Sequence, residues 1–125
     1  MKKAVLFLLL VLCFNITGCI GNSPSGVIKD FYQYIENGKI NDAFDLISEE
    51  GKQLLSLGGG ANFLARFTEN MKKQGGIKSI EIINEQIHGD RATVQHIMKF
   101  GNGATDKNTE QLIKQHGKWK IVPSK

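Results

Sequence analysis

The stretch of residues 75–100, GGIKSIEIINEQIHGDRATVQHIMKF, decides the fold, because the spacing of its apolar residues differs from that of the chain before it. The two glycines are a strong stop for a preceding helix. From Ile77 onward apolar side chains tend to recur at every second position, which is the period of a β-strand. The turn HGD (88–90) is short and carries a glycine, so the stretch predicts two antiparallel strands, 77–87 and 91–100.

The second of these strands alternates most clearly between apolar and polar side chains. One face is predicted to be covered, and it carries Ala92, Val94, His96, Met98 and Phe100. Downstream, the glycine-bearing turns GNGATD and HG separate two further predicted strands, 107–115 and 118–123. The C-terminal half therefore predicts a four-stranded antiparallel meander.

Upstream of residue 75 the apolar period is that of helices. Ser23 is the predicted N-cap of a helix, with Pro24 at its first position and Gly38 at its end. One face of this helix is apolar and carries Val27, Ile28, Phe31, Tyr34 and Ile35. A second short helix is predicted over 41–48, with Ser48 capping one further turn to Leu55. A third is predicted from Asn62 to Gln74. The sequence thus predicts an α+β fold, with about three N-terminal helices packed on one face of a four-stranded antiparallel sheet.

The charge balance argues against a nucleic-acid partner. The chain has 16 Lys and Arg against 12 Asp and Glu, a formal charge of +4, but Lys2 and Lys3 belong to a leader segment. The remainder is nearly neutral with mixed signs, which is the pattern of a solvated surface. No histidine or cysteine spacing suggests a metal site, and no motif calls for a cofactor.

Residues 1–18 have the three parts of a secretory signal peptide: a cationic start, an unbroken apolar run from Ala4 to Phe14, and a small polar end. The apolar run is too short to cross a hydrocarbon core, which takes about 20 helical residues. An uncleaved anchor over 4–20 and an ordinary secreted form are the alternatives. Cys13 and Cys19 both fall in this region, so neither is placed to crosslink the domain.

The tetrapeptide ITGC (16–19) resembles the lipobox of bacterial lipoproteins. The resemblance implies cleavage before Cys19, lipidation of its thiol and acylation of the freed amine, which together anchor a protein stably. Ile20 is not the aspartate that retains many lipoproteins at an inner membrane. The expected organisation is a signal peptide (1–18), a lipidated tether (19–23) and a domain (24–125). The expected location is the bacterial cell envelope, at the outer membrane facing the periplasm where two membranes exist.

The domain resembles small bacterial lipoproteins of unknown function with a nuclear-transport-factor-2-like (NTF2-like) fold, the cystatin-like α+β cone related to lumazine-binding-like domains. The resemblance rests on VIKDFYQYIENGK after Pro24, INDAFDLIS around Ala43, GGIKSIEIINEQIHGDRATV (75–94) and GKWKI (117–121). These segments are structural, with Trp119 as a core anchor. A shared fold does not carry a function.

The resemblance also implies a pocket on the inward face of the sheet, where enzymes of this fold place Asp, His and Tyr. The candidate pocket residues are His96, Tyr32, Tyr34, Asp45, Trp119 and Met98. His96, with Tyr32 or Tyr34 and Asp45, would form an acid–base set only if they lie within hydrogen-bond reach. The alternative is that His96 is a structural core residue whose ring is hydrogen-bonded.

These features favour a non-enzymatic module, anchored at Cys19, that binds a small apolar ligand, a peptide or an envelope protein. The alternative is an enzyme acting on a small hydrophobic or cyclic substrate through His96. A homodimer formed through the sheet is compatible with either function.

Overall fold

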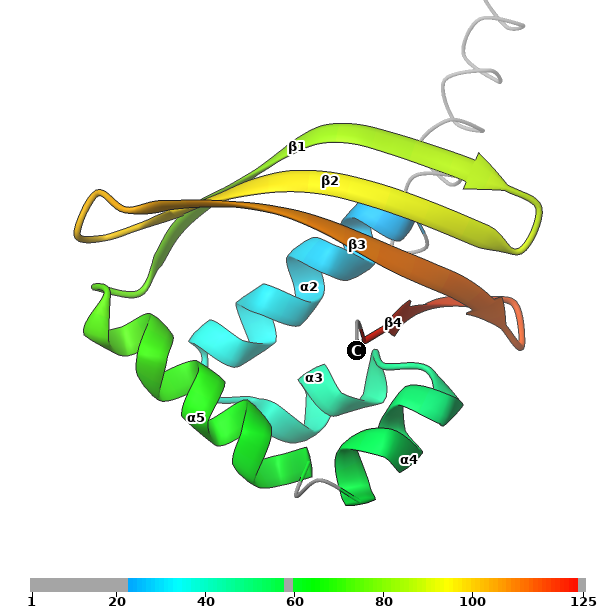
Figure 1. The fold of residues 1–125 in the computed structure, drawn as a ribbon, viewed down its shortest axis with the longest axis horizontal. Coiled ribbons are helices and arrows are strands. Elements are labelled where there is room, and N and C mark those ends of the chain that lie inside the picture. Colours follow the sequence, from blue (N-terminus) through cyan, green and yellow to red (C-terminus); the bar gives the residue numbers. More distant parts are fainter. Residues whose placement is uncertain (1–22, 58–59, 124–125) are drawn as a thin grey trace, which may run out of the picture.

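The computed structural model describes residues 23–57 and 60–123. Its helices are α2 (Pro24–Glu36), α3 (Ile40–Asp45), α4 (Glu49–Leu57) and α5 (Gly60–Lys73). Its strands are β1 (Ile77–His88), β2 (Arg91–Phe100), β3 (Thr105–Gln115) and β4 (Lys118–Val122). Neighbouring strands pair antiparallel in the order β1-β2-β3-β4, and the sheet arches over the helices (Figure 1). The predicted α+β architecture is confirmed.

The core lies between the helices and the face of β2 that was predicted to be covered. The five alternating residues of that face are each at most 4 % exposed, and they are Ala92, Val94, His96, Met98 and Phe100. Ile28 and Ile35 of α2 are fully buried against this face, and Trp119 of β4 completes it. Most of the apolar period in the sequence is therefore explained by burial.

Two serines cap helices as predicted. Ser23 Oγ accepts a hydrogen bond from the backbone N–H of Gly26 at 3.0 Å, and Ser48 Oγ accepts one from Gly51 at 3.1 Å. The Ser48 segment also closes the outer edge of β4, because the Ser48 N–H donates to the Ile121 carbonyl at 2.8 Å. Such caps satisfy amide groups that the first turn of a helix leaves unpaired.

The helices differ from the prediction in three places. Tyr32, not Tyr34, belongs to the buried face of α2, since Tyr32 is 4 % exposed and Tyr34 is only partly buried. A full helix, α4, forms where a single turn was predicted. Helix α5 begins at Gly60, so Asn62 lies inside it and is not its cap.

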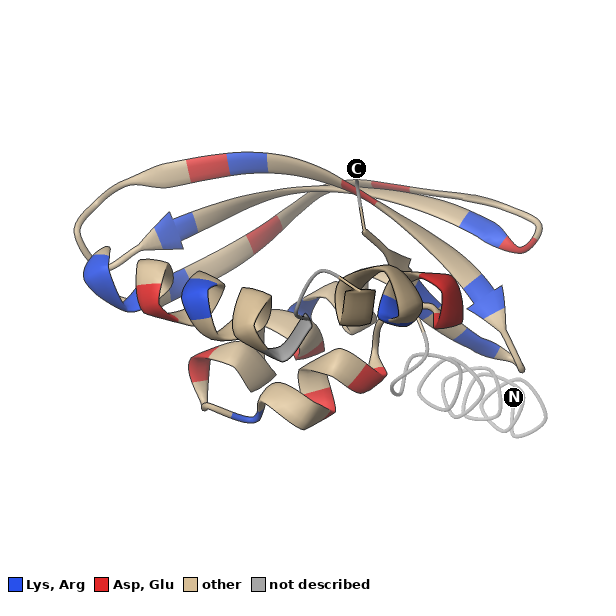
Figure 2. Ribbon diagram, turned by 60° about the horizontal axis from the view of Figure 1, so that its bottom comes forward, with Lys and Arg blue, Asp and Glu red and all other residues tan. Residues whose placement is uncertain are grey.

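Strand β3 is longer than its partner β4. Pairing with β4 covers Gln111–Gln115 only, while β2 pairs with β3 from Thr105 to Ile113. The segment Thr105–Glu110, here called the open segment of β3, thus pairs with a strand on one side only within residues 23–57 and 60–123. Basic and acidic residues are interspersed along the strands and helices (Figure 2).

A close backbone contact fixes the end of the sheet nearest α5. The Gly101 N–H donates to the Gly76 carbonyl and the Asn102 N–H to the Gln74 carbonyl, both at 2.9 Å. A Cβ on Gly101 would overlap the carbonyl oxygen of Gly75, so only glycine allows this approach. The turn after α5 is thereby joined to the β2–β3 hairpin.

Candidate functional site

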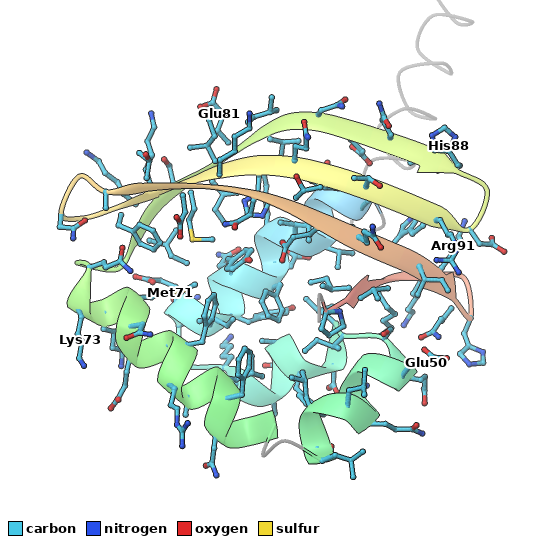
Figure 3. The ribbon with its side chains drawn as sticks, in the orientation of Figure 1. Glu50, Met71, Lys73, Glu81, His88 and Arg91 are labelled. Atoms are coloured by element: carbon cyan, nitrogen blue, oxygen red, sulfur yellow. The ribbon has the colours of Figure 1, made fainter. Side chains whose placement is uncertain are left out.

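A pocket of about 670 Å³ opens where β4 stops covering β3. Its walls come from α2, α5, β2, the open segment of β3 and the end of β4. The lining residues are Tyr32, Phe67, Asn70, Met71, Gln74, Met98, Phe100, Asp106, Asn108, Thr109, Glu110, Gln111, Val122 and Pro123. Figure 3 shows Met71 directed from α5 toward the sheet. The pocket therefore follows from the mismatch in length between β3 and β4.

Glu110 is the most firmly held polar side chain in this pocket. Its Oε1 accepts a hydrogen bond from the Tyr32 hydroxyl at 3.1 Å, and its Oε2 lies 3.0 Å from His96 Nε2. The His96 side chain is fully buried, while that of Glu110 is 21 % exposed. Glu110 consequently shields His96 from the pocket and presents its own carboxylate there.

The buried nitrogen of His96 indicates which tautomer this arrangement holds. A carboxylate only accepts, so His96 must carry a proton on Nε2. His96 Nδ1 is buried and has no hydrogen-bond partner among the described residues. A proton there would be an unsatisfied buried donor, which is costly. The geometry thus fits a neutral imidazole with its proton on Nε2, beside a carboxylate that keeps its negative charge.

Tyr32 serves as a permanent hydrogen-bond donor to this carboxylate. Burial raises the pKa of its hydroxyl far above the ordinary value, and the adjacent charge of Glu110, the hydrogen bond to it and the charge of Asp106 act in the same direction. Each of these effects disfavours a phenolate. The hydroxyl therefore stays protonated and keeps Glu110 in one orientation.

The remaining lining combines aromatic, aliphatic and uncharged polar groups. The Tyr32 and Phe67 rings lie 6.3 Å apart, and the Tyr32 and His96 rings 5.5 Å apart. Asp106 and Glu110 are acidic, and none of the described lining residues is Lys or Arg. The pocket is thus partly apolar and carries negative charge.

The sequence-based candidates are only partly brought together. Tyr32 and Met98 line the pocket, and His96 lies directly behind Glu110. Asp45 lies elsewhere, with a side chain that is 73 % exposed and 3.7 Å from Lys52 Nζ. Tyr34 packs against the core outside the pocket lining. The set of His96, Asp45 and either Tyr32 or Tyr34 is therefore not formed.

Trp119 is a core residue and not a pocket wall. It is 5 % exposed and is absent from the lining, and Lys114 Nζ lies 5.6 Å from the centre of its ring. Its role matches the core anchor expected from GKWKI.

Glu110 was missed by the sequence analysis, although a signal for it exists. The β2–β3 register places Glu110 opposite Val94 and Asn108 opposite His96, so Glu110 is diagonal to His96 on the same face. Extending the alternation of β2 across the 101–104 turn would have placed an acid next to the buried histidine.

The described part of the chain shows neither a metal-binding cluster nor a membrane-spanning helix. Residues 23–57 and 60–123 contain no group of three or more His, Cys, Asp or Glu side chains placed to hold a metal ion. No helix in these ranges combines the length and the apolar composition that a bilayer span requires.

Structural comparison defines the class of the domain. A protein from Campylobacter jejuni, described as a candidate NTF2-like transpeptidase, aligns with a TM-score of 0.68 at 21 % identity, over 82 % of this chain and 100 % of that one. A SEC-C motif containing protein from Rhodopseudomonas palustris aligns with a TM-score of 0.63 at 16 % identity, over 89 % of this chain and 85 % of that one. At these identities the likeness shows the fold alone, and that fold is NTF2-like.

The family is shown by sequence. Residues 17–122 match the family described as a domain of unknown function, DUF4878, and the chain belongs to this family. Comparison with curated proteins gave no significant match.

Proposed function

We propose that this protein is a lipid-anchored module of the bacterial cell envelope whose pocket binds a small amphipathic ligand without transforming it. The observation that carries the proposal is the pocket beside the open segment of β3. Its volume of about 670 Å³ lies within the usual range of ligand sites, roughly 300–1,000 Å³. Its lining offers apolar walls for a ligand body and a few fixed polar groups for orientation.

The burial of His96 supports binding over catalysis. A general acid or base must come within hydrogen-bond reach of the atom it protonates or deprotonates. His96 is fully buried, its Nε2 is hydrogen-bonded to Glu110, and its Nδ1 has no hydrogen-bond partner among the described residues. An enzyme acting through His96 would need to displace Glu110, so the alternative function has weaker support.

The proposed anchor comes from the sequence, since Cys19 lies outside the described residues. Helix α2 starts at Pro24, and Ser25 Oγ donates to Glu85 Oε2 of β1 at 2.7 Å. The tether 19–23 has five residues, which gives a reach of at most about 18 Å. A lipid on Cys19 would therefore hold the domain close to the bilayer by its β1 side, with the pocket on β3 away from the anchor.

The anchor is tested by the mass of the mature protein from its bacterial host, with and without inhibition of the lipoprotein signal peptidase. Cleavage before Cys19 together with added acyl mass is the expected result. A Cys19→Ser variant should lose the acyl mass and leave the membrane fraction. An intact leader on the wild-type protein would contradict the anchor.

The pocket is tested by titrating the isotope-labelled domain with 2-phenylethanol and following its amide signals by NMR. The expected result is a set of shifts confined to the lining residues. Asn70→Trp would block the mouth from α5 and abolish these shifts. Asn62→Trp, an exposed position of the same helix outside the lining, is the matched control. Shifts spread over the whole surface, or no shifts with either 2-phenylethanol or 2-phenylethylamine, would refute the binding function.

A further inference from the structure

We infer that the pocket selects ligands carrying a positive charge, such as a primary or quaternary ammonium group attached to an apolar body. The inference rests on the proposed binding function and names the ligand class for the same pocket. It comes from the way Glu110 is held and from what the rest of the lining lacks.

The carboxylate of Glu110 is fixed by neutral donors. Tyr32 and His96 both hydrogen-bond to it, and the buried, unpartnered Nδ1 of His96 favours the uncharged imidazole. Hydrogen bonds from neutral groups orient a carboxylate without cancelling its charge. Because Glu110 is only 21 % exposed, water compensates this charge incompletely.

No basic side chain of the described chain supplies the missing charge. Among the described residues the Lys or Arg side chain that lies within 4.0 Å of a carboxylate is Lys52, and its partner is Asp45, so no described Lys or Arg lies within 4.0 Å of Glu110 or Asp106. The chain as a whole has a formal charge of +4. The pocket lining is thus negatively charged although the chain as a whole is positively charged, and this would favour a cation over an anion in the pocket.

The aromatic walls complement this charge. Tyr32 and Phe67 both line the pocket, with ring centres 6.3 Å apart. A ring face attracts an ammonium group, and a neighbouring carboxylate reinforces that attraction. Met71 and Met98 add adaptable apolar surface for the body of the ligand.

The test compares three probes that share a phenylethyl body: 2-phenylethylamine, 2-phenylethanol and 3-phenylpropanoate. At neutral pH they carry a positive charge, no charge and a negative charge. The wild-type domain should bind the amine about 10-fold more tightly than the alcohol, and the carboxylate more weakly than either. Dissociation constants come from the NMR shifts of the lining residues.

Glu110→Gln keeps the size of the side chain and removes its charge, so it should abolish the preference for the amine over the alcohol. Glu81→Gln makes the same charge change on β1, where the side chain points away from the helices (Figure 3), and should keep the preference. The probe series on the wild-type domain needs no variant, so it tests selection for a cation even if Glu110→Gln does not fold.

The outcomes separate the two proposals. If the alcohol binds in the pocket as tightly as the amine, selection for a cation is refuted while the binding function stands. If the preference survives in Glu110→Gln, the assignment to Glu110 is refuted. If no probe shifts the lining residues, both proposals fail.

Discussion

Replacing Glu110 by leucine tests whether the carboxylate exists to satisfy two buried donors. The substitution removes the acceptor for the Tyr32 hydroxyl and for His96 Nε2, which belong to residues that are 4 % and 0 % exposed. A buried donor left without a partner costs about 1–3 kcal/mol. With two such donors, and some gain from burying the leucine, Glu110→Leu should lower the free energy of unfolding by about 2–4 kcal/mol.

The same substitution should behave differently where the donors are absent. In a Tyr32→Phe/His96→Leu background, Glu110 has lost both hydrogen bonds and remains mostly buried. Replacing it with leucine should then cost nothing or stabilise the domain, as when a buried polar network is exchanged for apolar residues.

Urea denaturation of the four proteins, followed by circular dichroism at pH 7, gives the required free energies. The slope of free energy against urea should be unchanged, so that midpoints report stability. If Glu110→Leu costs the same in both backgrounds, within about 0.5 kcal/mol, the two hydrogen bonds do not account for its effect and the description of this cluster is wrong.

Three further changes probe the fold. The Tyr32 pKa is raised in the folded state, so above pH 10 only the unfolded state releases this proton. In urea titrations the free energy of unfolding of the wild-type domain should therefore fall, relative to Tyr32→Phe, by up to about 1.4 kcal/mol per pH unit. Parallel curves of free energy against pH for the two proteins would contradict this. Gly101→Ala should cost about 2–4 kcal/mol by thermal unfolding, because its Cβ meets the Gly75 carbonyl; under 1 kcal/mol would refute the close contact. Ser48→Ala should cost about 1 kcal/mol by urea denaturation, whereas exposed Ser56→Ala should cost little; equal losses would remove the capping role.

The sheet was predictable because its information is local. The alternation from Arg91 to Phe100 specified one face, and the glycine-bearing turns specified the hairpins, so the strand order followed. Helix α2 was predictable from its cap and apolar period. Which tyrosine of α2 is buried was not predictable, because both Tyr32 and Tyr34 lie within one helical turn of the apolar face. Packing against β2 buries Tyr32.

The pocket was less predictable because it arises between elements. The sequence marked His96 as a polar residue on an apolar face, but its partner depends on the β2–β3 register. Asp45 was chosen as a carboxylate near the helices, whereas its side chain is turned outward. The mouth itself depends on β4 ending at Val122, before it covers all of β3. Such a difference in strand length has no signature in either strand alone.

The open segment of β3 has a consequence for self-association. Unpaired strand edges are templates on which a second molecule can add its own strand, and proteins limit this with polar and charged edges. Residues 105–110, TDKNTE, contain no apolar side chain and carry three charged residues. With this composition the pocket wall can stay uncovered, because a polar and charged edge disfavours the addition of a strand from a neighbouring molecule. Attempts to reshape the pocket should therefore alter α5, since apolar substitutions in TDKNTE would invite edge-to-edge aggregation.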